Sequence, residues 1–246
     1  MTITSEAVGM GRFHRAADGA DLPGLVLVHD VWGLSEHSAA LASDWAREGF
    51  GVLEIDLYRR LDRVEIEDVG AWIRRLSDPE VVADLEAGAR WLAEESAACR
   101  GRRVGITGVC MGGLYTLLAA CRSDRFAAAA PFYGMLSYDE GMLAADEGRD
   151  RVRKPVSPIE ASEGLRCPTI ASFGREDGFV PEADVDALEA GFSRSGTRFE
   201  IDRYEGAGHA FLNRTRPEAY SEAASAAAWS RVVPFMRDAL GGRAPL

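Results

Sequence analysis

Lysine, paired cysteines and long apolar runs are what this 246-residue chain has least of. Lys154 is its only lysine, and the formal net charge is -11. Without a block rich in Lys and Arg, the composition argues against nucleic acids and anionic membranes as partners. No apolar run approaches the roughly 20 residues that span a bilayer, and residues 1–15 lack the pattern of a secretory signal. We therefore expect a cytoplasmic protein, with an acidic monomer as the default state.

The cysteines are few and scattered, and they are Cys99, Cys110, Cys121 and Cys167. They show neither a CxxC motif nor the Cys/His spacing of a metal site, so we predict no bound metal. Four scattered cysteines in a chain of this length also indicate a reducing compartment and no disulfide framework.

Cys110 lies in a glycine-rich turn, residues 108–113, between a predicted buried strand at 103–107 and a predicted helix at 114–121. Gly-x-Cys-x-Gly between a strand and a helix is the nucleophile elbow with cysteine in the serine position. The start of a helix favours the thiolate, which is the nucleophile, and the N–H of Met111 is placed to receive an oxyanion. The alternative is a tight joint whose thiol is a small buried hydrophobe.

Strands and helices alternate along the whole chain. We predict one or two edge strands within 3–16, then strands at 24–28, 51–57, 126–132, 169–173 and 198–204. Helical patterns follow Ser35 and cover 64–76, 79–97, 182–195 and 217–240. This order predicts an α/β fold, a mostly parallel central sheet with helices on both faces, in a single domain over 1–246. The charged, proline-bearing connection at 135–164 is either a solvated surface loop or a lid over the site.

Reactive side chains follow three of the predicted strands, in the order Cys110, Asp177, His209. Active sites of open α/β sheets lie at the carboxyl ends of strands, and nucleophile, acid, histidine is the order of α/β-hydrolases. Cys110 would attack an acyl carbonyl, His209 would move the proton and Asp177 would orient the imidazole. Glu176 competes with Asp177, although the residues that follow favour Asp177. The second oxyanion donor is predicted at Val31, after the first central strand.

The other histidines have no comparable setting. We predict His37 on a helix surface and His14 on an exposed strand, and His29 beside Asp30 stays ambiguous.

Five stretches, taken together, resemble the dienelactone hydrolase family; they are residues 29–34, 55–58, 108–113, 177–181 and 208–211. The resemblance covers about residues 23–238. It implies an α/β-hydrolase fold and cofactor-free hydrolysis of an ester or lactone. It also implies the triad Cys110, His209 and Asp177, with oxyanion donors at Val31 and Met111.

The chain departs from the family at two positions near the nucleophile. Asp30 stands where well-known members have a glutamate. Those members also hold a substrate carboxylate with arginines, one of them four residues after the histidine, where this chain has Asn213 followed by Arg214. An amide cannot replace a bidentate guanidinium, so the fold and triad carry over better than the dienelactone substrate. Trp32, Asn213 and Arg214 are the candidate substrate contacts.

We therefore expect a hydrolase of small esters or lactones, of the dienelactone hydrolase (carboxymethylenebutenolidase) type, that forms an acyl-thioenzyme at Cys110. Two alternatives stay open. One is a binding protein that keeps the α/β-hydrolase fold without catalysis. The other is a thiol redox sensor at Cys110, because an accessible thiolate is also an oxidation target.

Overall fold

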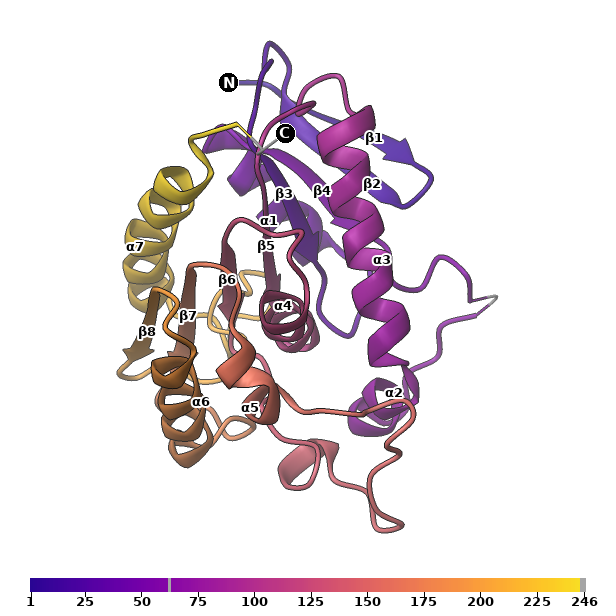
Figure 1. Ribbon diagram of the computed structural model, residues 1–246, viewed down its shortest axis with the longest axis vertical. Coiled ribbons are helices and arrows are strands. Elements are labelled where there is room, and N and C mark those ends of the chain that lie inside the picture. Colours follow the sequence, from indigo (N-terminus) through magenta and orange to yellow (C-terminus); the bar gives the residue numbers. More distant parts are fainter. Residues whose placement is uncertain (62, 244–246) are drawn as a thin grey trace.

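The computed structural model describes residues 1–61 and 63–243, which form one eight-stranded sheet with helices on both faces (Figure 1). The strands are β1 (Ile3–Val8), β2 (Gly11–Ala16), β3 (Gly24–Val28), β4 (Gly51–Ile55), β5 (Val104–Val109), β6 (Ala129–Phe132), β7 (Thr169–Gly174) and β8 (Phe199–Tyr204). The α-helices are α1 (Glu36–Arg47), α2 (Val69–Arg75), α3 (Asp78–Arg90), α4 (Met111–Arg122), α5 (Pro158–Ala161), α6 (Glu182–Ser195) and α7 (Glu222–Leu240). The predicted fold class is confirmed.

The strand order is β1-β2-β4-β3-β5-β6-β7-β8. The hairpin β1–β2 joins β4 in antiparallel fashion, and every other neighbouring pair is parallel. Two strands form within 3–16, as one or two were expected, but only β1 lies at the edge, because β2 pairs with β1 on one side and with β4 on the other. A turn follows the hairpin, where the Gly19 N–H donates to Ala16 O. Strands β3, β4 and β5 are buried throughout, which accounts for their continuous apolar runs.

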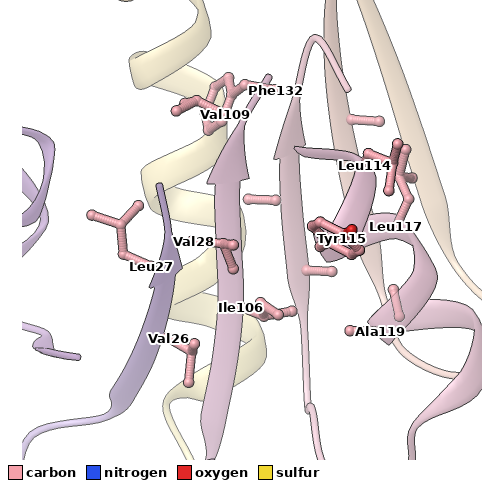
Figure 2. Packing of buried hydrophobic residues seen from close by; sticks show 14 of the residues in the cluster. Val26, Leu27, Val28, Ile106, Val109, Leu114, Tyr115, Leu117, Ala119 and Phe132 are labelled. Carbon is pink, nitrogen blue, oxygen red and sulfur yellow. The ribbon is translucent and has the colours of Figure 1, made fainter. Parts of the chain in front are cut away.

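The core lies between the sheet and two layers of helices. Figure 2 shows α4 on one side of the strands and the C-terminal helix on the other, with Val28 and Ile106 between them. Helices α1 and α7 pack on one another through Trp45 and Trp229, whose ring centroids are 4.6 Å apart. Val232, Val233 and Met236 lie on the buried face of α7.

The chain reverses its direction of travel across the sheet between β3 and β5. From β3 it proceeds to β4 on one side, and β5 then lies on the other side, with Val28 opposite Gly108. The loops that leave the carboxyl ends of these two strands therefore diverge, and ligands of open α/β sheets bind in the crevice at such a point. Asp30 and Val31 follow β3, and Cys110 follows β5.

The connection 135–164 is fixed to the body of the protein by its lysine. The Lys154 ammonium is buried and donates to Asp78 Oδ1 at 2.6 Å and to the Tyr115 hydroxyl at 3.0 Å. The Tyr138 hydroxyl donates to the other oxygen of Asp78 at 2.8 Å. At this point the connection is packed onto α3 and α4 rather than solvated, although its charged stretch 145–153 is largely at the surface.

No helix among the described residues has both the length and the hydropathy that a bilayer crossing requires.

Candidate active site

Cys110 occupies a strained turn between β5 and α4. Its φ and ψ are 56° and -118°, and a left-handed φ costs a non-glycine residue about 1–3 kcal/mol. Flanking glycines make the turn feasible, because a Cβ on Gly108 would lie 2.4 Å from Gly112 O and a Cβ on Gly112 would lie 2.2 Å from Val28 O. The Cys110 N–H donates to Phe132 O at 3.1 Å. The geometry is that of a nucleophile elbow, with the cysteine at its apex.

His209 and Asp177 meet at the carboxyl ends of β8 and β7. The Asp177 side chain is completely buried, and its Oδ2 lies 2.8 Å from His209 Nδ1. Its Oδ1 accepts the Phe179 N–H at 2.8 Å, which fixes the carboxylate. Because a carboxylate only accepts, Nδ1 carries a proton and Nε2 is left for the reaction.

The protonation of His209 is set by its two acidic neighbours. Burial lowers the pKa of His209, but the hydrogen bond to Asp177 and the proximity and negative charge of Cys110 and Asp177 outweigh burial and raise the pKa to about 10. Nε2 is buried and makes no hydrogen bond of ordinary geometry to any residue in the described parts of the chain. The structure thus brings the predicted nucleophile, histidine and acid into one site.

The two residues predicted to supply oxyanion donors are tied together by Tyr58. Its hydroxyl donates to Val31 O at 2.9 Å and lies 3.5 Å from Met111 Sδ. Met111 is the first residue of α4, a position whose N–H has no acceptor within its own helix. The binding of an oxyanion by Val31 and Met111 stays a prediction.

Asp30 lies in the loop after β3, near enough to His209 for the charge of that ring to act on it. It is buried, and its Oδ1 accepts the Trp32 N–H at 2.9 Å. Burial raises the pKa of Asp30, and the charges of His29, Arg216 and His209 act in the opposite direction. Trp32 is 48% exposed, and the guanidinium of Arg216 lies 6.0 Å from the centre of its ring.

The polar groups of Asn213 and Arg214 are already engaged within the protein. Asn213 Oδ1 accepts from the N–H and the hydroxyl of Thr215, at 3.0 and 2.7 Å, and Arg214 pairs with Asp44 of α1. Arg216 is the arginine beside Trp32, and the sequence analysis missed it. The signal available was the second arginine of the Arg-Thr-Arg stretch at 214–216.

Two aromatic residues that the sequence analysis also missed enclose His209. The Tyr133 ring packs edge-on against the imidazole at 5.2 Å between centroids, and the Phe179 ring does so at 5.0 Å. Tyr133 is buried, whereas Phe179 is 49% exposed. Tyr133 comes directly after a predicted strand, as Cys110 does, and this position was the available signal.

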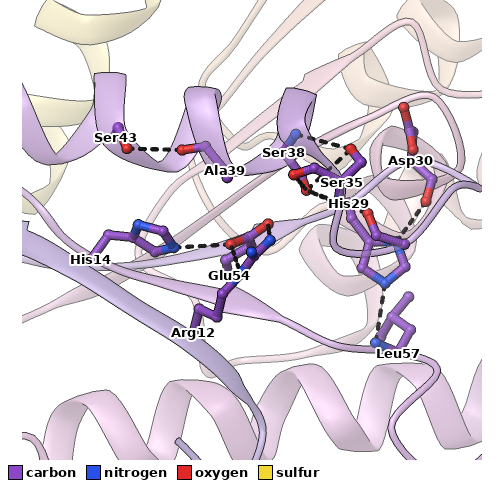
Figure 3. A network of polar contacts seen from close by, with 11 residues as sticks. Arg12, His14, His29, Asp30, Ser35, Ser38, Ala39, Ser43, Glu54 and Leu57 are labelled. Carbon is purple, nitrogen blue, oxygen red and sulfur yellow. Dashed lines mark hydrogen bonds and ion pairs between the residues drawn. The ribbon is translucent and has the colours of Figure 1, made fainter. Parts of the chain in front are cut away.

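The predictions for His37 and His14 were wrong, because both residues are buried. Figure 3 shows His14 beside Glu54. Burial, helped by the charge of Arg214, lowers the pKa of His37 to about 4. His14 Nε2 lies 2.9 Å from Glu54 Oε2, in a network that includes Arg12. β1 covers the outer edge of β2 and α1 packs on its face, so β2 is not an exposed strand.

The ambiguity over His29 is also settled by its surroundings. Its Nδ1 donates to Asp30 O, and its Nε2 accepts the Leu57 N–H at 3.2 Å (Figure 3). Both ring nitrogens hold loops in place, and burial lowers the pKa of His29. His29 is therefore a neutral structural residue.

The sheet topology, the elbow at its switch point and the histidine in the loop after the last strand define an α/β-hydrolase. A model of the dienelactone hydrolase family matches residues 10–240, and the chain belongs to that family. It is accordingly a hydrolase of the carboxylic ester and lactone class.

Relatives with assigned names cover most of the chain. It is 30% identical over 225 residues to a probable 2-oxo-3-(5-oxofuran-2-ylidene)propanoate lactonase of Bradyrhizobium sp, covering 90% of this chain and 86% of the relative. It is 27% identical to a carboxymethylenebutenolidase of Rhodococcus opacus, with coverages of 90% and 83%. Among solved structures, a putative dienelactone hydrolase from Klebsiella pneumoniae superposes with a TM-score of 0.81 at 26% identity, covering 96% of this chain and 98% of that one.

Proposed function

We propose that this enzyme hydrolyses small esters or lactones through an acyl-thioenzyme on Cys110, with His209 as the proton carrier and Asp177 as its orienting acid. The observation that supports this most is the 2.8 Å contact between His209 Nδ1 and Asp177 Oδ2. It leaves Nε2 as the free nitrogen of a ring whose pKa responds to Cys110. Positioned imidazole, thiol and carboxylate are what nucleophilic acyl transfer requires.

The first half-reaction follows from these positions. The Cys110 sulfur attacks the acyl carbon, and the N–H groups of Val31 and Met111 receive the negative oxygen of the tetrahedral intermediate. When the intermediate collapses, the C–O bond of the ester breaks and the leaving oxygen takes the proton from His209 Nε2. The acyl group remains on sulfur as a thioester. In the second half-reaction, water attacks that thioester and restores the thiolate.

The substrate class is supported by the names of the relatives and by one cation. The Bradyrhizobium relative is named for a lactone that bears a propanoate group. In the present chain, Arg216 lies against the Trp32 ring beside the buried Asp30. Arg216 therefore provides a positive charge beside Trp32. The position four residues after the histidine, where the family has an arginine, is Asn213 in this chain and carries no charge.

The decisive experiment is hydrolysis of a panel by the wild type and by Cys110→Ala. The panel contains cis- and trans-dienelactone, p-nitrophenyl acetate and p-nitrophenyl butyrate. We expect Cys110→Ala to abolish turnover with the fold intact, since the substitution removes the sulfur that would carry the acyl group. Cys121→Ala is the matched control, because Cys121 is buried within α4, the helix that Cys110 precedes, and burial raises the pKa of its thiol to about 12. This variant should keep full activity.

The outcomes separate the alternatives. Turnover retained in Cys110→Ala would refute the mechanism. No turnover of any ester, with no acyl adduct on Cys110 by intact mass, would support a binding protein. Peroxide modification of Cys110 without hydrolysis would support a redox sensor. A dienelactone turned over well above the aryl esters would point to Arg216 as the cation that holds the carboxylate.

A further inference from the structure

Tyr133 is held rigidly at the carboxyl end of β6 in a conformation that residues with side chains rarely adopt. Its φ is 39°. The Tyr133 N–H donates to Ser172 O at 2.8 Å, and the preceding carbonyl, of Phe132, accepts the Cys110 N–H at 3.1 Å. The backbone at Tyr133 is therefore bonded to β7 on one side and to the nucleophile elbow on the other. Such strain persists where the surrounding structure over-determines the conformation, and it clusters at active sites.

The side chain of Tyr133 carries a buried hydroxyl without a partner. The ring is 1% exposed and packs edge-on against both His209, at 5.2 Å, and Phe211, at 5.1 Å. Its hydroxyl makes no hydrogen bond of ordinary geometry within residues 1–61 and 63–243. A buried polar group left unpaired costs about 1–3 kcal/mol, so a phenylalanine would fill this space better. Packing alone therefore does not account for the hydroxyl.

A second buried polar atom without a partner lies on the ring that Tyr133 touches. It is Nε2 of His209, the nitrogen available for the reaction. Burial is the largest cause that raises the pKa of the Tyr133 phenol well above its ordinary value. The charges of Cys110, Asp30 and Asp177 act in the same direction, and the nearby Leu212 backbone acts in the opposite direction without outweighing them. The phenol therefore stays a neutral hydroxyl, close enough to Cys110 and Asp177 for their charges to act on it.

We propose that Tyr133 positions the water that hydrolyses the acyl-thioenzyme. The inference rests on the proposed function. The water donates one hydrogen to His209 Nε2 and the other to the Tyr133 hydroxyl oxygen, so its lone pair points at the thioester carbon. As the C–O bond forms, Nε2 takes the first proton. The C–S bond then breaks with its electron pair going to Cys110 Sγ, and the carboxylic acid leaves.

The two half-reactions depend differently on this hydroxyl. During acylation, Nε2 serves the Cys110 thiol and then the leaving oxygen of the substrate, and no water has to be held. Tyr133→Phe should therefore slow deacylation and leave acylation nearly unchanged. Loss of a buried hydroxyl that has no partner should not lower the melting temperature.

The test is a stopped-flow measurement with p-nitrophenyl acetate, combined with intact-mass detection of acetyl-Cys110 after single turnover. For Tyr133→Phe we expect an acylation rate within about twofold of wild type and a decay of the acyl-enzyme about tenfold slower, the effect of one lost hydrogen bond. Tyr204→Phe is the matched control, since its ring packs on Phe211 as well, at 5.5 Å, and its hydroxyl donates to Asp202 at 3.3 Å. It should change neither rate.

Three results would overturn the proposal. They are equal slowing of acylation and deacylation in Tyr133→Phe, an unchanged rate of acyl-enzyme decay, and the same slow decay in Tyr204→Phe. Absence of any acyl adduct in the wild type would instead refute the acyl-thioenzyme mechanism itself, so the two failures are distinguishable.

Discussion

His209 links the chemistry of the site to the stability of the protein. Its pKa of about 10 in the folded state exceeds the ordinary value of 6.5, so folding favours the protonated ring. The resulting stabilisation is complete below pH 6.5 and is lost as the pH rises from 6.5 to about 10. We expect the melting temperature of wild type to exceed that of His209→Gln at pH 6, and the difference to shrink steadily towards pH 10.

Thermal unfolding of both proteins from pH 6 to pH 10 measures this difference. Measuring both proteins at every pH provides the control, because contacts of His209 that do not titrate change the difference in melting temperature by the same amount at every pH. A difference independent of pH would mean that His209 is not protonated on folding.

Single residues show where sequence patterns stop being informative. Cys110, Asp177 and His209 could be predicted because each follows a strand in the order of a known chemistry. His14 could not be placed, since its burial depends on β1 and α1 packing over β2. His37 could not be placed either, since it is buried on α1 within reach of the charge of Arg214, which is far away in the sequence. Burial arranged by distant segments leaves no local trace in the chain. For the same reason, the contact of Tyr133 with His209 emerges only in three dimensions.

At the scale of elements, the elbow depends on the close approach of α4 to β3. A Cβ on Gly112 would lie 2.2 Å from Val28 O and 2.7 Å from His29 O, and backbone atoms cannot move aside as a flexible side chain can. We expect Gly112→Ala to destabilise the protein by about 3 kcal/mol and to displace Cys110 from His209. Urea unfolding and the rate of ester hydrolysis measure the two effects.

Gly9→Ala is the control for this substitution, because its added Cβ would meet no atom within 4 Å. It should leave both stability and turnover close to wild type. Equal stability of Gly112→Ala and wild type would show that the close contact between α4 and β3 is not required.

Elements were predicted more accurately than their ends. The buried strands could be predicted because short apolar runs bounded by polar loops are typical of strands covered on both faces. Helix α4 begins at Met111, three residues before its predicted start. Gly112 and Gly113 resemble a turn in the sequence, but they lie in the helix and allow its backbone to approach Val28 and Phe132 closely. Helix α2 begins after Asp68, whose carboxylate accepts the Ala71 N–H at 2.7 Å, rather than at residue 64.

At the scale of the whole molecule, the site is assembled from loops that lie far apart in the sequence. Residues after β3, β5, β7 and β8 converge because parallel strands end at one edge of the sheet. This convergence could be predicted from the order of strands and helices. The attachment of the connection 135–164 could not, because it depends on a buried ion pair between residues 76 positions apart.

That ion pair, Asp78–Lys154, should be strongly coupled in its effect on stability. Burial raises the pKa of Asp78 and lowers the pKa of Lys154, and their mutual attraction offsets both effects in part. Removing one partner leaves the other charge buried, so Lys154→Met should cost about 3–5 kcal/mol. Replacing both, as Asp78→Leu with Lys154→Met, should cost less than the sum of the single changes, because no buried charge remains. Urea unfolding of the single and double variants measures the coupling.

An exposed ion pair, Arg166–Asp124, is the control for the buried one. Arg166 and Asp124 are 45% and 81% exposed, and Asp124→Asn should hardly change stability.

If 135–164 is a surface loop, Lys154→Met should lower stability without changing KM. If the segment is a lid, releasing it from α3 and α4 should also change KM, because the pair would then hold the closed arrangement over bound substrate. Equal stability of Lys154→Met and wild type would contradict the anchoring role on either view.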